Sequence, residues 1–179
     1  MGEARIKPGN RQQLGIVNSL IARAGGRAVG AHQLNLFAVI GKHRWLLRTM
    51  LPFMGRLMPG GKLPRQDTEL VILRVGHLTG AEYERHQHGP MALKAGLTQA
   101  DVERSGQPGQ DGWSGRHAAL IAAVDELHET RNLSDASWAA LKPHYDERQL
   151  IELVMLTGAY EMVAMTINTL GVQIESGVA

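Results

Sequence analysis

The chain has 179 residues, of which 44% are hydrophobic and 20% charged, and its formal net charge is +2. That length suits one domain with a sizeable core, and the absence of cysteine excludes disulfides, cysteine-bound zinc and thiol catalysis. The basic residues are scattered among acids, which argues against a nucleic acid partner. Because no apolar signal segment and no run of about 18 uncharged apolar residues occurs, we expect a cytoplasmic protein with no membrane span.

The pattern along the chain predicts a flexible arm over residues 1–9 and one domain over residues 10–179. No segment alternates as a half-buried strand does, so the fold class is expected to be all-α, with about seven helices. Helical patterns cover residues 10–24, 32–40, 43–58, 68–78, 81–95, a short stretch from 98, 113–130, 134–144 and 146–170.

Short polar and glycine signals set the predicted ends of these helices. Asn10 is a candidate N-cap, and the pair at 25–26 is expected to end the first helix. Asp67 is expected to cap the helix that follows, and the pair at 79–80 to end it. Thr98 begins a capping-box pattern.

Two segments carry apolar residues in a way that indicates more than a simple surface helix. Residues 43–58 are apolar around the whole circumference, with Pro52 as an interruption, which indicates either a central core helix or a contact between subunits. The sequence Leu-Thr-Gly-Ala at 78–81 recurs at 156–159, each time after an apolar helix. This recurrence favours an internal pseudo-two-fold of helical hairpins, although chance also produces such short repeats.

The stretch from 69 to 88 concentrates the polar chemistry of the chain beside a buried apolar run. Glu84 and His88, at i and i+4, share one face of a helix, whereas Glu82 and His86 lie on nearly the opposite face. Because a turn at 79–80 reverses the chain, Glu69 and His88 should lie at heights that differ by only about 4.5 Å.

This stretch resembles the carboxymuconolactone decarboxylase family, which includes the alkylhydroperoxidase D-like proteins. The likeness rests on Glu-x-x-x-Leu-Arg-Val at 69–75, Gly-Ala-Glu-Tyr-Glu at 80–84 and His88, with looser matches at Gly-Leu-Thr of 96–98, Tyr160 and Asn-Thr-Leu-Gly-Val at 168–172. It implies an alkylhydroperoxidase D-like helical bundle and a homo-oligomer, either a trimer or a hexamer.

The resemblance also shows one departure. The peroxidase branch of the family carries a Cys-x-x-Cys pair, and here those two positions are Ala81 and Glu84, while Tyr83 replaces the intervening histidine. The family histidine is present as His88. The resemblance therefore implies a glutamate–histidine pocket and excludes thiol chemistry, even though a peroxiredoxin label attaches to the family.

The favoured hypothesis is a cofactor-free, metal-free decarboxylase-like lyase that acts on a small lactone-type carboxylate, as the resemblance to an aromatic-catabolism family implies. Glu69 and His88 would perform acid–base chemistry, and Tyr83 would donate to an enolate. Binding of the substrate carboxylate would fall to three side chains: Arg74, Glu84 and Arg85.

Each assignment has a plainer reading: a surface carboxylate for Glu69, a structural histidine for His88, internal ion pairs for the arginines and a core aromatic for Tyr83. A metal site of Glu69, Glu84 and His88 is less favoured, and His77 and His86 are further candidates for the site. The alternatives to the lyase are a peroxidase-like oxidoreductase and a non-catalytic helical oligomer that binds a small acid.

Overall fold

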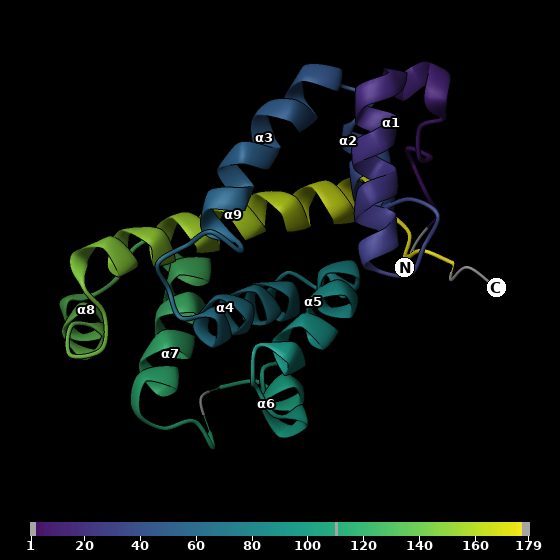
Figure 1. Cartoon of the computed structure of the whole chain (residues 1–179). Helices are drawn as coiled ribbons and strands as arrows, with labels where there is room; N and C mark the ends of the chain where they lie inside the picture. Colours follow the sequence, from purple (N-terminus) through teal and green to yellow (C-terminus); the bar gives the residue numbers. More distant parts are fainter. Residues whose placement is uncertain (1–2, 110, 177–179) are drawn as a thin grey trace. The chain divides into compact units, whose positions relative to one another are not determined.

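The computed structural model describes residues 3–109 and 111–176, and these residues form nine helices and no strand (Figure 1). The all-α prediction is confirmed. The helices are α1 (Arg11–Ala28), α2 (Asn35–Ile40), α3 (Arg44–Leu57), α4 (Arg65–Leu78), α5 (Glu82–Lys94), α6 (Gln99–Arg104), α7 (Gly115–Thr130), α8 (Asp135–Leu141) and α9 (Glu147–Leu170).

The described chain divides into two compact units. Unit 1 combines the residues up to 56 with those from 166 onward, and unit 2 is the continuous segment 57–165. Helix α9 begins in unit 2 and ends in unit 1. All the residues that form the candidate site below belong to unit 2.

In unit 1, helix α1 packs against α2 and starts where the sequence predicts. Asn10 accepts a hydrogen bond from the Gln13 N–H, and the Gln13 side chain accepts one from Asn10, which completes a capping box. The glycine pair at 25–26 does not end the helix, contrary to prediction. A Cβ on Gly26 would lie 2.4 Å from Gln33 Cα, so this glycine makes room for the returning chain.

The N-terminal segment is attached to unit 1 by backbone hydrogen bonds. The Arg5 and Ile6 N–H groups donate to the Leu170 carbonyl at 3.0 and 3.1 Å, and Gly9 donates to the Ala38 carbonyl at 2.9 Å. The described part of the predicted arm is therefore anchored at both of its ends.

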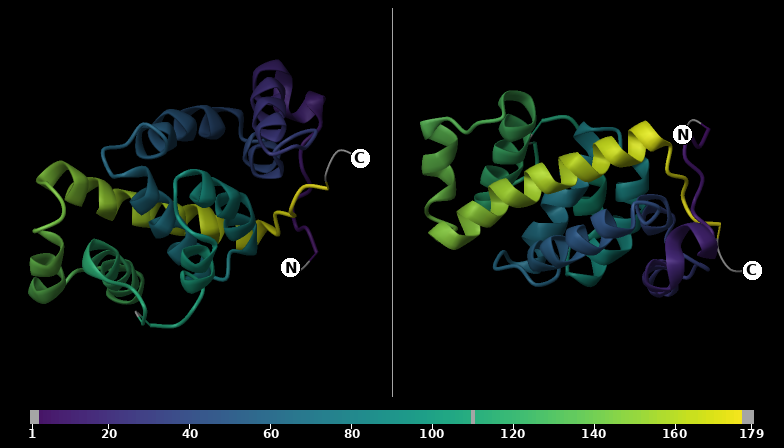
Figure 2. Two further views of the ribbon diagram at one scale, coloured as in Figure 1. Left: turned by 60° about the horizontal axis from the view of Figure 1, so that its bottom comes forward. Right: turned by 90° about the horizontal axis from the view of Figure 1, so that it is seen from above.

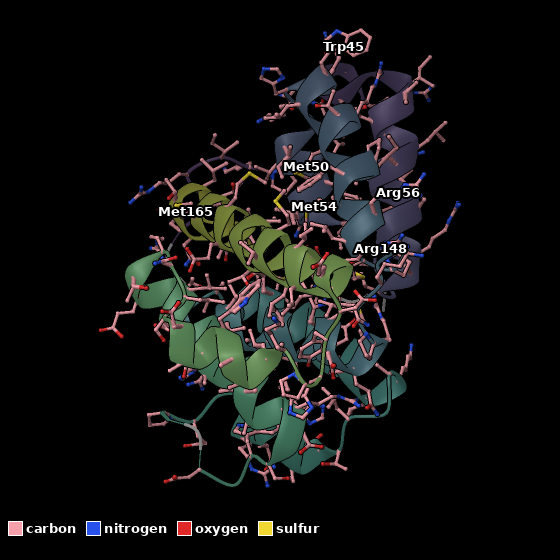
Figure 3. The ribbon with its side chains drawn as sticks, turned by 90° about the vertical axis from the view of Figure 1, so that its left-hand side faces the viewer. Trp45, Met50, Met54, Arg56, Arg148 and Met165 are labelled. Carbon is pink, nitrogen blue, oxygen red and sulfur yellow. The ribbon has the colours of Figure 1, made fainter. Side chains whose placement is uncertain are left out.

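Helix α3 is not a buried core helix. Leu47 and Leu57 are buried, whereas Trp45 is 71% exposed and Phe53 is exposed as well. Trp45, Met50 and Met54 all project from this one helix (Figure 3). Of the two alternatives for this segment, a central core helix does not fit these exposures. A contact between subunits stays a prediction.

In unit 2, helix α4 is buried along most of its length and packs against α5 and α7. It begins at Arg65, directly after Pro64, so the prediction that Asp67 caps a helix from 68 is wrong. The Lys62 and Leu63 N–H groups donate to the Glu152 carboxylate at 2.6 and 3.0 Å, so a side chain of α9 holds the loop that leads into α4.

The repeated Leu-Thr-Gly-Ala sequence has two different conformations. At 78–81 it forms the α4–α5 turn, with Gly80 at a φ of 63°, whereas at 156–159 it lies inside the uninterrupted helix α9 (Figure 2). The second hairpin is therefore absent from this segment. Helix α9 is long and apolar enough to span a membrane by length and composition, but half of its apolar window is buried within the protein, as in many core helices.

Candidate functional site

The site is built on the α4–α5 hairpin. The Ala81 N–H donates to the Gly76 carbonyl at 2.8 Å, and the positive φ of Gly80 lets the chain reverse within three residues. Gly76 also permits close packing, because a Cβ there would lie 3.0 Å from Arg85 Cγ and 3.5 Å from Glu84 Cβ. The hairpin brings the middle of α5 against the first half of α4.

Glu69 and His88 form a buried pair across this hairpin. His88 Nδ1 lies 2.7 Å from Glu69 Oε2, and the two residues are 8% and 0% exposed. The structure thus brings together the two residues that the hairpin geometry predicts to meet. An ionised Glu69 accepts the Nδ1–H of His88, so Nε2 is the nitrogen left to exchange a proton with a ligand.

Arg65 lies beside this pair, one helical turn before Glu69. Its Nη2 forms an ion pair with Glu69 Oε1, while its Nη1 is buried without a hydrogen-bond partner among the described residues. Glu69 Oε1 lies within ion-pair distance but lacks hydrogen-bond geometry. The charges of Arg65 and Glu69 are thus paired, but their hydrogen-bonding capacity is not used up among the described residues.

Glu84 is the second buried carboxyl group. It is 2% exposed, and neither carboxylate oxygen has a hydrogen-bond partner within the described chain. Burial raises its pKa to about 8, because the low-dielectric interior disfavours the ionised form. Native proteins leave few buried polar atoms unsatisfied, so such atoms on Arg65, Glu69 and Glu84 indicate a place for a polar ligand or water.

Tyr160 of α9 contacts His88. Its ring stands edge-on to the His88 ring, with centroids 5.3 Å apart and an interplanar angle of 84°. Burial raises the pKa of its hydroxyl, and the negative charges of Glu69 and Glu84 raise it further. Both carboxyl groups are therefore close enough to Tyr160 to act on it electrostatically, and the phenol stays neutral.

Asp67 anchors the start of α4 to other parts of unit 2. The buried carboxylate accepts hydrogen bonds from Arg116 Nε at 3.1 Å and from the Tyr145 hydroxyl at 2.8 Å, and it lies 3.1 Å from His117 Nε2. These three partners come from α7 and the segment before α9. Asp67 therefore fixes the position of α4 through tertiary contacts, which explains why it is not available as a cap.

The two arginines predicted to bind substrate are engaged elsewhere. Arg74 is buried and donates to Asp125 through Nε at 2.5 Å and Nη2 at 2.7 Å, and also to three carbonyls between 105 and 109. Arg85 donates to the Leu73 carbonyl at 3.1 Å, and burial followed by the charge of Arg74 lowers its pKa. These contacts join α4 to α7 and α5 to α4; they do not support a role for either arginine in substrate binding, which stays a prediction.

The remaining candidates are Tyr83, His86 and His77. Tyr83 is buried, but at about 100° per residue it is about 140° from His88 around α5, and the ring that contacts His88 is that of Tyr160. His86 is exposed, as its spacing predicts. His77, whose pKa is lowered first by burial, lines an open pocket of about 550 Å³ with Asp125 and other residues.

Sequence reasoning missed two members of the site. Arg65 precedes Glu69 by four residues, which is the helical ion-pair spacing, but the predicted helix began too late to include it. Tyr160 belongs to the looser part of the family likeness, and no spacing links it to His88, 72 residues earlier along the chain. Among the described residues, no group of three histidine, aspartate or glutamate side chains is arranged to hold a metal ion.

Comparison with known proteins gives the fold and a family match over part of the chain. Residues 46–126 match the Carboxymuconolactone decarboxylase family, and no curated protein matches the chain. The fold is similar to the alkylhydroperoxidase AhpD core of an uncharacterized peroxidase-related protein from Ralstonia eutropha JMP134, with a TM-score of 0.85, 13% identity, and coverage of 98% of this chain and 94% of that one.

Two further solved structures are similar at the level of the fold. A peroxidase-related protein from Silicibacter sp. TM1040 has a TM-score of 0.76 at 13% identity, covering 88% of this chain and 84% of that one. The debrominase Bmp8 has a TM-score of 0.74 at 15% identity, covering 96% and 92%. Residues 46–126, which contain the Glu69–His88 hairpin, thus match the carboxymuconolactone decarboxylase family, and the described chain has an alkylhydroperoxidase D-like fold; its sequence has no cysteine.

Proposed function

We propose that the protein is a cofactor-free acid–base enzyme that decarboxylates a small lactone-type carboxylate. The observation that carries this proposal is the buried Glu69–His88 pair, which holds an imidazole with one nitrogen anchored and the other left for proton exchange. The family match over residues 46–126 is consistent with this chemistry. The absence of cysteine argues against a thiol peroxidase route.

The residues of the site support each part of the reaction. The substrate carboxylate needs a cation, and Nη1 of Arg65, which has no hydrogen-bond partner among the described residues, is a guanidinium nitrogen that could bind it. The carbon–carboxylate bond breaks, CO₂ leaves, and the electron pair moves into the conjugated carbonyl as an enolate. His88 then delivers a proton to carbon and recovers one from solvent, while Glu69 stabilises the imidazolium.

The test is CO₂ release from unsaturated carboxylated γ-lactones by the full chain, with His88→Gln as the variant and His86→Gln as its matched control. His86 is on the same helix but exposed, so its variant should keep full turnover. Loss of an acid–base group lowers rates by about 10²–10⁴-fold, and we expect a loss of that size for His88→Gln. Equal turnover by the two variants would refute the assignment.

Two other outcomes point to the other function classes. Tight binding of these lactone acids without CO₂ release would favour a non-catalytic protein that binds a small acid. Turnover of an alkyl hydroperoxide by metal-free protein, well above a denatured control, would favour a peroxidase that works without thiols.

A further inference from the structure

Glu84 occupies a position that the acid–base pair does not account for. Its side chain is buried on α5 one helical turn before His88, and neither carboxyl oxygen has a hydrogen-bond partner among the described residues. A glutamate kept in such surroundings without a partner costs stability, so a role in ligand binding is the simplest reason for its presence.

The protonation state of Glu84 follows from its surroundings. Two ionisable groups can be related to it: His88 follows it by one helical turn on α5, and Tyr160 of α9 has a pKa that is raised by the charges of Glu69 and Glu84. Burial raises the pKa of Glu84 to about 8, so in most molecules at pH 7 its side chain is a neutral carboxylic acid. A neutral carboxylic acid offers one O–H donor and one carbonyl acceptor.

We infer that Glu84 is a second catalytic residue of the site, a carboxylic acid that donates its proton to the ligand's carbonyl oxygen as the enolate forms. The inference rests on the proposed function and deepens it. Glu84 lends its proton to the enolate oxygen while CO₂ leaves, and it recovers that proton when the carbonyl re-forms on protonation of carbon by His88. The net reaction still consumes one proton from solvent.

With this role, the two carboxyl groups of the site, Glu69 and Glu84, have different functions. Glu69 is paired with His88 and Arg65 and acts as an anion, whereas Glu84 has no hydrogen-bond partner among the described residues and acts as an acid. Two carboxyl groups with different surroundings are a general way of assigning acid and base roles in one site. The neutral phenol of Tyr160 adds no charge that would compete with either role.

The test is infrared difference spectroscopy of the full chain, with paraconate, a saturated γ-butyrolactone carboxylate that does not decarboxylate, as the probe. Wild-type protein at pH 7 should show the carbonyl band of a protonated carboxylic acid, shifted in D₂O, and Glu84→Gln should lack it. Glu82→Gln, an exposed change two residues away, should keep it. Saturating paraconate should lower the frequency of this band in the wild type, because the O–H then donates to the probe.

Titration of the wild type gives a second measurement that needs no variant. The band should disappear as the pH rises through about 8, and paraconate affinity should fall about tenfold for each pH unit above that value. A missing band in the wild type, a band that survives in Glu84→Gln, or a band unmoved when calorimetry shows paraconate bound would overturn the inference. Failure of paraconate to bind wild-type protein would instead remove the proposed substrate class, and the inference with it.

Discussion

Replacing Glu84 with glutamine should make the protein more stable at neutral and mildly alkaline pH. Glutamine has the same shape and is neutral at every pH, so it removes the cost of keeping an ionisable carboxyl group buried without a partner. The pKa of Glu84 is about 8 in the folded protein against an ordinary value of 4.5. The unfolded chain therefore ionises this group over a pH range in which the folded chain still holds the proton.

The sign and size of the effect follow from proton linkage. Below about pH 4.5 both states are protonated, and Glu84 has no pH-dependent effect on the free energy of unfolding. As the pH rises from there to about 8, the wild type loses about 1.4 kcal/mol for each pH unit. Above about pH 8 the loss is complete, at about 5 kcal/mol, and it stays constant.

Urea unfolding followed by circular dichroism at a series of pH values between 5 and 9 measures this difference. The gain in unfolding free energy of Glu84→Gln over wild type should be small at the acid end and should rise to several kcal/mol at the alkaline end. Glu82→Gln, exposed on the same helix, should differ from wild type by a nearly constant amount. Parallel stability curves for wild type and Glu84→Gln would refute the reasoning, because they would mean that Glu84 ionises at the same pH in both states.

Three further expectations test other parts of the structure. Glu69→Gln and His88→Gln should each lower CO₂ release by about 10²–10⁴-fold, and the double variant should be little worse than either, since residues that act as one unit lose activity non-additively in steady-state kinetics. Asp125→Asn should leave the buried guanidinium of Arg74 without its anion and lower the free energy of unfolding by about 3 kcal/mol in urea titrations; an unchanged midpoint would contradict this. We also propose that the chain forms a homo-oligomer, a trimer or hexamer, through the apolar surface that includes Trp45; light scattering should show an assembly that Trp45→Lys weakens, and a wild-type monomer at micromolar concentration would exclude it.

Much of the fold could be predicted because the helices carry local signals. The N-cap at Asn10, the capping box at Thr98 and the turn at Gly80 depend on residues within four positions of each other, and the structure confirms all three. The Glu69–His88 contact could be predicted for the same reason, since one tight turn joins their two helices and helix geometry fixes their heights.

What could not be predicted depends on partners far away in the sequence. Arg74 reads equally well as a substrate ligand or an internal ion-pair partner until Asp125, 51 residues later, is placed beside it. Asp67 has the sequence context of a helix cap, but its carboxylate oxygens instead contact side chains that are distant in the sequence, those of Arg116, His117 and Tyr145. Gly26 and Gly158 could not be assigned from local sequence either. Each lies inside a long helix, α1 or α9, whose packing overrides the weak tendency of glycine to end a helix.

The division of the chain into two units has a consequence for biosynthesis. Unit 1 is assembled from residues before 57 and after 165, so its first three helices emerge from the ribosome well before the segment that completes it. Unit 2 is continuous and holds the whole acid–base site, so its helices can associate as soon as residue 165 is available. We therefore expect the apolar side chains of α3, such as Trp45, to stay exposed for most of translation, and chaperone binding and misassembly to concentrate at this early segment.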